Sequence, residues 1–114
     1  MEAHVLAGLP PQAVWELFEG ISGVPRCSGK EQPIRAWVKE WASRKGIGCR
    51  EDQTGNLLLR REASEGFRHV PVLVLQAHMD MVPQKTAATV HDFVKDPIPA
   101  YVDGAWVKAD QTTL

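Results

Sequence analysis

Two stretches in the first half of the chain repeat their hydrophobic residues at helical spacing. Within residues 11–21 the apolar positions are Val14, Leu17, Phe18 and Ile21. Between Ser28 and Gly46 they are Ile34, Trp37, Val38 and Trp41. Spacings of three and four residues place such side chains on one face of a helix. Proline suits a first helical turn and glycine a helix end, so Pro11 and Gly46 fit as boundaries. We therefore predict two short amphipathic helices.

The beginning of the second helix is less regular than its middle. Ser28 and Glu31 have the spacing of a capping box, in which the two residues cap each other's backbone N–H groups. Pro33, however, would then fall just beyond the positions at which a missing N–H is harmless. We therefore expect the regular helix to begin near Gln32.

Shorter apolar runs separated by turn residues predict strands. Residues 48–52 and 56–61 flank the sequence Gln-Thr-Gly, which indicates an antiparallel hairpin. Residues 101–107 contain an Asp-Gly pair between apolar positions, which is the signal of a second hairpin. Residues 84–99 lack periodicity and contain two prolines, so we expect a long irregular loop there. Long loops in compact domains are often functional.

An aliphatic run in the second half of the chain ends in an abrupt change of polarity. Residues 72–75 are Val-Leu-Val-Leu, and His78 and Asp80 follow shortly after them. Such a run is typical of a strand covered on both faces, so we expect a central strand over residues 71–77. In open α/β sheets, ligands bind just beyond the carboxyl ends of the strands. Alternate residues there can point the same way, which would aim His78 and Asp80 together.

The composition excludes some classes of function. The 114 residues are 44% hydrophobic and 24% charged with a net charge of −1, so we expect neither nucleic acid nor a membrane as partner. No apolar run approaches the roughly 20 residues that span a bilayer. The first ten residues lack the basic start of a secretory signal. Cys27 and Cys49 lie far apart, which favours reduced thiols and a cytoplasmic protein.

His78 and Asp80 are the strongest candidates for chemistry. Neutral imidazole is a good zinc ligand, and a nearby carboxylate can orient the ring through its second nitrogen. His-x-Asp is also frequent by chance, so the alternative is a pair bonded only to backbone or solvent. A catalytic zinc needs about three protein ligands, and the pattern offers no obvious set. His91 and Asp92, in the long loop, are either substrate contacts or a solvated pair.

Several motifs resemble those of the aminoacyl-histidine dipeptidase family, within the carnosinase-like co-catalytic zinc peptidases. Residues 76–85, Gln-Ala-His-Met-Asp-Met-Val-Pro-Gln-Lys, resemble its first metal motif. The resemblance continues in residues 90–98, Val-His-Asp-Phe-Val-Lys-Asp-Pro-Ile, and in residues 104–109, Gly-Ala-Trp-Val-Lys-Ala. Residues 52–58 are similar to its hairpin, and residues 15–25 to its opening helix and loop. The similarity is collinear over almost the whole chain.

This resemblance implies an α/β fold, the opening portion of a zinc-peptidase catalytic domain with a mixed β-sheet flanked by helices. It implies two divalent metals, usually zinc, with His78 as a ligand to one and Asp80 as the catalytic carboxylate that steadies the His78 ring. An intact member of the family hydrolyses dipeptides, notably those with a C-terminal histidine, and we expect it to be a cytoplasmic homodimer. A metal-bound water attacks the peptide carbonyl, with a glutamate as general base.

The sequence also departs from the family pattern. The family's further metal ligands and its general base follow the Thr-Thr-Leu found here at residues 112–114, and Asp110-Gln111 replaces an expected Arg-Gly. We therefore expect residues 1–114 to be a partial N-terminal segment of the catalytic domain, without the rest of that domain and without the lid and dimerisation domain. The isolated chain should be inactive and prone to aggregation. The alternatives are a non-catalytic remnant or interaction module, and another amidohydrolase or deacylase of the same clan.

Overall fold

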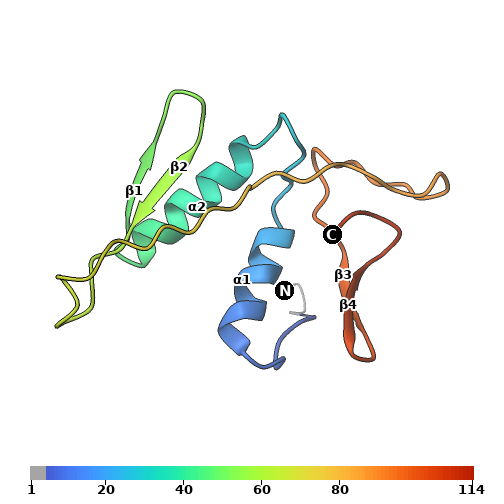
Figure 1. The fold of residues 1–114 in the computed structure, drawn as a ribbon. Helices are drawn as coiled ribbons and strands as arrows, with labels where there is room; N and C mark the ends of the chain where they lie inside the picture. Colours follow the sequence, from blue (N-terminus) through green and yellow to red (C-terminus); the bar gives the residue numbers. More distant parts are fainter. Residues whose placement is uncertain (1–4) are drawn as a thin grey trace. The chain divides into compact units, whose positions relative to one another are not determined.

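The computed structural model describes residues 5–114, and these residues form two compact units. The first unit contains the chain up to Ile34 together with Asp80–Leu114, and the second contains Arg35–Met79. Two helices and four short strands occur within the described residues (Figure 1). Each of the two sheets is a two-stranded antiparallel hairpin.

The first unit contains α1 (Gln12–Ser22) and the hairpin of β3 (Ala100–Asp103) and β4 (Trp106–Ala109). The hairpin pairs Ala100 with Ala109 and Asp103 with Trp106, which confirms the turn predicted from Asp-Gly. The end of α1 is tied to the segment before β3, because the Ile98 N–H donates to the Ser22 carbonyl oxygen at 2.9 Å. Both residues are buried, so this bond lies in the interior of the unit.

The second unit contains the body of α2 (Gln32–Arg44) and a hairpin of β1 (Gly48–Glu51) and β2 (Leu57–Arg60) (Figure 1). The Ile47 N–H donates to the Ala42 carbonyl oxygen at 2.9 Å where the chain leaves the helix. Glu51 on β1 then pairs with two cations of α2, at 2.6 Å from Lys39 Nζ and 3.2 Å from Arg35 Nε. The helix and the hairpin predicted from the sequence are both confirmed, and ion pairs connect them.

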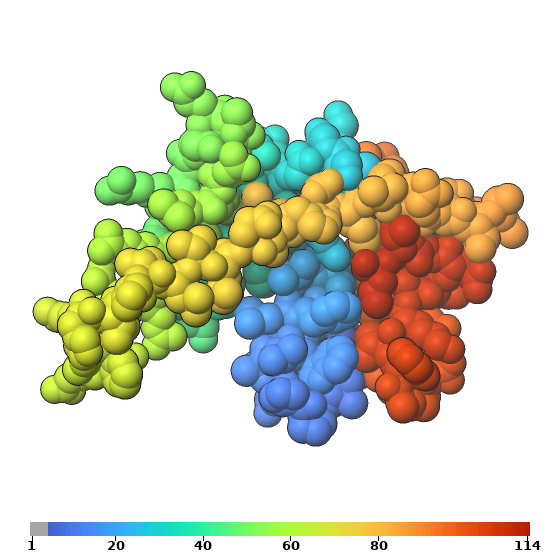
Figure 2. All heavy atoms as spheres, in the orientation of Figure 1, coloured from blue at the N-terminus to red at the C-terminus, as the bar shows by residue number. Residues whose placement is uncertain are grey.

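The central strand predicted over residues 71–77 is wrong for this chain. These residues belong to no strand, and Val72, Leu73 and Leu75 are 88%, 81% and 86% exposed. A strand needs a neighbour for its N–H and C=O groups, and in the described part of the chain neither hairpin pairs with this segment. Figure 2 shows this yellow-to-gold segment as a narrow string of surface atoms. The aliphatic pattern indicated a segment suited to a strand, but it contains no information on which strand would lie beside it.

The α/β class is confirmed by the helices and small sheets. Among residues 5–114 both ladders are antiparallel, and parallel pairing is limited to the isolated bridge between Cys27 and Met81. Neither helix in the described part of the chain has the length and apolar character required to cross a membrane.

Candidate functional site

A short bridge holds the segment that contains Asp80 against the loop after α1. The Met81 N–H donates to the Arg26 carbonyl oxygen at 2.9 Å, and the Ser28 N–H donates to the Met81 carbonyl oxygen at 3.1 Å. These two bonds make Cys27 and Met81 a parallel β-bridge. Both segments belong to the first unit, so two parts of the chain that are distant in sequence are fixed to each other next to Asp80.

The Ser28 side chain adds a direct contact with Asp80. Its hydroxyl Oγ donates to Asp80 Oδ2, and the two oxygens are 2.5 Å apart. A hydroxyl bound to an ionised carboxylate makes a charge-assisted bond, and such bonds are shorter and stronger than neutral ones. Ser28 is exposed and Asp80 is half-buried. The structure thus gives the predicted catalytic carboxylate a partner that the sequence did not reveal.

Ser28 does not form the capping box predicted from its spacing to Glu31. In that motif the Glu31 side chain would accept the Ser28 N–H, but Glu31 Oε1 accepts the Gly29 N–H at 2.6 Å. The Ser28 N–H bonds to Met81, and the helix begins at Gln32, as expected from Pro33. The capping-box prediction is wrong because residue spacing shows only local partners, whereas the partner chosen by Ser28 is distant in sequence.

The Arg26 side chain connects α1 to the β-bridge between Cys27 and Met81. Its Nη1 donates to the Ile21 carbonyl oxygen at 2.9 Å, and its Nη2 lies 3.9 Å from Met81 Sδ. The last carbonyls of a helix lack partners within the helix, so the Ile21 oxygen is a natural acceptor. Burial lowers the pKa of the Arg26 guanidinium below its usual value, and the group stays charged at neutral pH. The loop that carries Ser28 is therefore held at its other end by a half-buried cation.

His78 lies near the end of the second unit, two positions before Asp80 in the sequence. Its side chain is exposed. An accessible imidazole can offer a nitrogen to a metal ion or to a ligand. The role of His78 as a metal ligand stays a prediction.

The described residues include a candidate metal ligand, but they do not form a complete metal centre. Across residues 5–114, no three side chains of His, Cys, Asp or Glu are grouped so that they could hold a metal ion. His78 can supply a single nitrogen, whereas a zinc site needs three or four protein ligands.

The second His-Asp pair has a local structural role. The His91 and Phe93 rings meet edge to face with centroids 4.5 Å apart, and His91 Nε2 is buried without a hydrogen-bond partner. The Asp92 carboxylate accepts the Val94 N–H at 3.0 Å and pairs with Lys95 at 3.4 Å. The Val94 N–H and, to a lesser extent, the Lys95 side chain lower the pKa of Asp92. Asp92 therefore closes a turn within the long loop.

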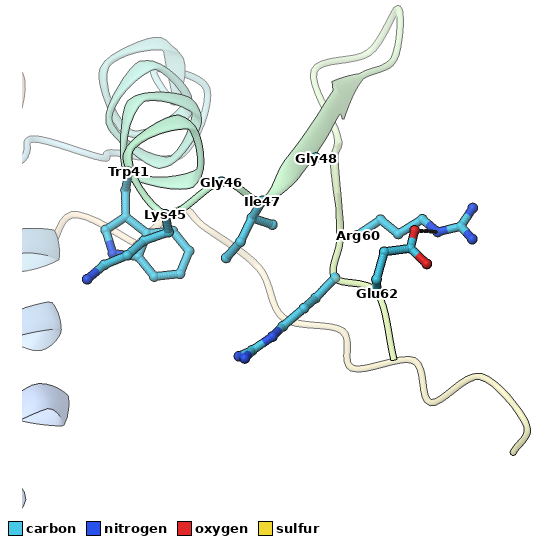
Figure 3. A pocket seen from close by; sticks show the side chains of 8 residues that line it. Trp41, Lys45, Gly46, Ile47, Gly48, Arg60 and Glu62 are labelled. Atoms are coloured by element: carbon cyan, nitrogen blue, oxygen red, sulfur yellow. Dashed lines mark ion pairs between the residues drawn. The ribbon is translucent and has the colours of Figure 1, made fainter. Parts of the chain in front are cut away.

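A hollow of about 660 Å³ lies in the second unit, between the end of α2 and the hairpin. Trp41 and Lys45 line it on the helix side, and Arg60 and Glu62 lie on the hairpin side, where they form an ion pair at 3.4 Å (Figure 3). The hollow is open to solvent and contains neither His78 nor Asp80. It is therefore not the site that the sequence motif indicates.

Comparison with known proteins identifies relatives. No protein-family model matches the chain. The chain is 48% identical over 109 residues to the cytosol non-specific dipeptidase of Escherichia coli (strain K12). This alignment covers 96% of this chain and 22% of that protein. The crystal structure of aminoacylhistidine dipeptidase from Vibrio alginolyticus matches with a TM-score of 0.88 and 40% identity, over 92% of this chain and 21% of that one. The chain thus resembles dipeptidases in both sequence and fold.

The chain spans about a fifth of the length of the dipeptidases that it matches. A more distant match is the LysW-lysine hydrolase of Deinococcus radiodurans, which is 36% identical over 73 residues, covering 63% of this chain and 18% of that protein. The resemblance inferred from the sequence motifs is thus confirmed by both sequence and fold.

Proposed function

We propose that the chain supplies the N-terminal part of the catalytic domain of a metal-dependent dipeptidase. The observation that carries this proposal is the 48% identity to a dipeptidase, which extends over 96% of the chain and therefore includes its His78–Asp80 motif. The fold match to an aminoacylhistidine dipeptidase adds support. The remaining catalytic domain and a lid and dimerisation domain would complete a cytoplasmic homodimer.

In this proposal His78 binds one of two divalent metals, most simply zinc, and Asp80 holds the His78 ring in the orientation that binding requires. A carboxylate beside a ligating histidine fixes the tautomer and the direction of the ring. When bound, the metals would supply Lewis-acid chemistry for peptide hydrolysis. The substrates are dipeptides, notably those with a C-terminal histidine. Residues 1–114 alone should not hydrolyse them, because the described residues do not complete a metal centre.

The test is a chimaera in which this chain replaces the aligned segment of the E. coli dipeptidase. We expect the chimaera to hydrolyse carnosine and other dipeptides with a metal requirement. Loss of a residue that only supports a metal ligand usually lowers activity by about 10- to 100-fold. His78→Ala removes the proposed ligand itself, so it should lower kcat/KM by more than that. His69→Ala is the matched control, since His69 is another exposed histidine of the second unit. Equal activity of the two variants would refute the role of His78.

A second candidate is an amidohydrolase or deacylase of the same clan. The match to the LysW-lysine hydrolase favours it, although that match covers only 63% of this chain. A substrate panel decides between the dipeptidase and the deacylase. A dipeptide has a free α-amino group on the residue before the scissile bond, whereas an acylated lysine does not. Preferential cleavage of acylated lysine by the chimaera would replace the dipeptidase proposal.

A further inference from the structure

The contact between Ser28 and Asp80 links two motifs that the sequence presents as independent. Ser28 lies in the loop between the two helices, and Asp80 belongs to the proposed catalytic segment. We infer that Ser28 is a positioning residue that sets the direction of the Asp80 carboxylate. This inference rests on the function proposed above for Asp80.

The first argument is that the surrounding backbone presents the Ser28 hydroxyl to Asp80. The Ser28 N–H and the Arg26 carbonyl oxygen both bond to Met81, at 3.1 and 2.9 Å, so the residue after Asp80 is held on two sides. The Lys30 N–H also donates to the Cys27 carbonyl oxygen at 2.8 Å, which closes a tight turn around Ser28. These backbone bonds hold the main chain of Ser28 next to the main chain of Met81, which follows Asp80.

The second argument is that Asp80 obtains little order from the segment before it. Residues 71–77 belong to no strand in the described structure and are exposed, so no sheet holds the chain as it approaches Asp80. The bridge at Met81 fixes the backbone, but it leaves rotation about the side-chain bonds of Asp80. A hydrogen bond to Oδ2 restricts that rotation, because it favours the side-chain angles that keep Oδ2 beside the Ser28 hydroxyl.

The consequence is specific to the hydroxyl group. Ser28→Ala removes the donor and leaves the backbone bonds of residue 28 in place. Ser28→Thr keeps the donor. Cys27→Ala changes the neighbouring side chain, whose Sγ contacts the Ser28 carbonyl oxygen. The alanine and threonine variants therefore separate the effect of the hydroxyl from a general disturbance of the loop.

The first experiment uses the metal-free chain and does not depend on catalysis. Nuclear magnetic resonance couplings about the Asp80 Cα–Cβ bond report whether its side chain occupies one rotamer or several. We expect one dominant rotamer in the wild type, in Ser28→Thr and in Cys27→Ala, and averaging between rotamers in Ser28→Ala. An Asp80 side chain that is equally ordered in Ser28→Ala, or equally averaged in the wild type, would overturn the inference.

The second experiment measures kcat and KM separately in the chimaera with the E. coli dipeptidase. Ser28→Ala should lower kcat by about 10- to 100-fold, the usual effect of removing a supporting partner, with little change in KM. Ser28→Thr should restore most of the loss. An unchanged kcat in an active Ser28→Ala chimaera overturns the inference and leaves the proposed function intact. A chimaera without dipeptidase activity overturns the proposed function, and the rotamer measurement then decides the inference alone.

Discussion

The Asp52 side chain closes the turn between β1 and β2 with hydrogen bonds to Thr54 and Asn56. Its Oδ1 accepts the backbone N–H groups of Thr54 and Asn56, both at 2.9 Å, and the Thr54 hydroxyl at 2.8 Å. Its Oδ2 accepts the Asn56 side-chain amide at 2.8 Å. These bonds, those of Asn56 first and then those of Thr54, hold the pKa of Asp52 far below its ordinary 3.8. An aspartate that bonds to the backbone two residues later is a recurrent way to close a turn.

We predict that Asp52→Ala lowers the stability of the hairpin and makes that stability less dependent on pH. The carboxyl has a lower pKa folded than unfolded, so its contribution is fully present above the ordinary pKa of 3.8. It is lost as the pH falls through the folded pKa. Urea denaturation followed by circular dichroism should therefore show a wild-type advantage at neutral pH that shrinks in acid.

Gln53→Ala is the control for this prediction, because Gln53 is an exposed residue of the same turn. It should leave both the midpoint and its pH dependence close to the wild type. An advantage of the wild type over Asp52→Ala that is the same at neutral and acid pH would show that the charge of Asp52 plays no part.

Individual residues of the candidate site differ in how far the sequence predicts them. His78 and Asp80 are predicted from their position after an aliphatic run and from the motif around them, and their roles stay a prediction. The role of Ser28 was missed, because the serine is far from Asp80 in sequence and its spacing to Glu31 suggested a helix cap. A side chain with two possible partners is assigned correctly only when the geometry of the distant partner is known.

At the scale of elements, local signals predicted the fold well. Both helices and both hairpins were predicted, because amphipathic spacing and turn residues act within a few positions. The strand over residues 71–77 was not, because a strand depends on neighbours that no local pattern specifies. The relation between α2 and the first hairpin also depends on contacts between distant residues, namely those of Arg35 and Lys39 with Glu51.

Gly55 makes a testable connection between the first hairpin and α2. Its φ is +92°, and a Cβ added there would lie 2.9 Å from Arg35 Nη1 and 3.0 Å from Arg35 Cζ. We predict that Gly55→Ala destabilises the second unit in two ways. The left-handed backbone costs roughly 1–2 kcal/mol in a residue with a Cβ. The displaced Arg35 would also lose its ion pair with Glu51, and such partly exposed pairs contribute about 0.2–1 kcal/mol.

Gly66→Ala is a matched control for Gly55→Ala. Gly66 has a φ of +82° in the same unit, and a Cβ there would meet nothing within 4 Å. It should therefore incur the backbone cost alone, and the difference in unfolding free energy between the variants reports the contact with Arg35. In an Arg35→Ala background that difference should disappear. A difference of the same size in both backgrounds would mean that Arg35 is not responsible.

At the scale of the whole molecule, the buried hydrophobic core is small. Leu6, Ile34, Ala42 and Ile98 are the buried hydrophobic residues of the described chain. Domains are stable by only about 5–15 kcal/mol, and most of the favourable energy comes from burying apolar surface. A chain that leaves a four-residue aliphatic run at 77–88% exposure forgoes much of that energy. We therefore expect marginal stability for residues 1–114 alone.

The same run predicts how the isolated chain associates. Residues 72–77, Val-Leu-Val-Leu-Gln-Ala, combine high strand propensity with no charge and no proline. None of their backbone groups is paired within residues 5–114, so a second copy can add to them as a neighbouring strand. We predict association that increases with concentration, measured by size-exclusion chromatography with light scattering. Val74→Lys should reduce it strongly, because a charge on an unpaired strand opposes the approach of another.

Val90→Lys is the control for this last prediction, because Val90 is 100% exposed but lies in the loop after Pro83, outside the aliphatic run. Both substitutions add one positive charge, so they change the net charge of the chain equally. If association depends on strand pairing at the run, Val90→Lys should associate like the wild type while Val74→Lys stays monomeric. If both variants dissociate to the same extent, general charge repulsion explains the effect and the run is not the interface. A wild type that is monomeric at every concentration would contradict the predicted association itself.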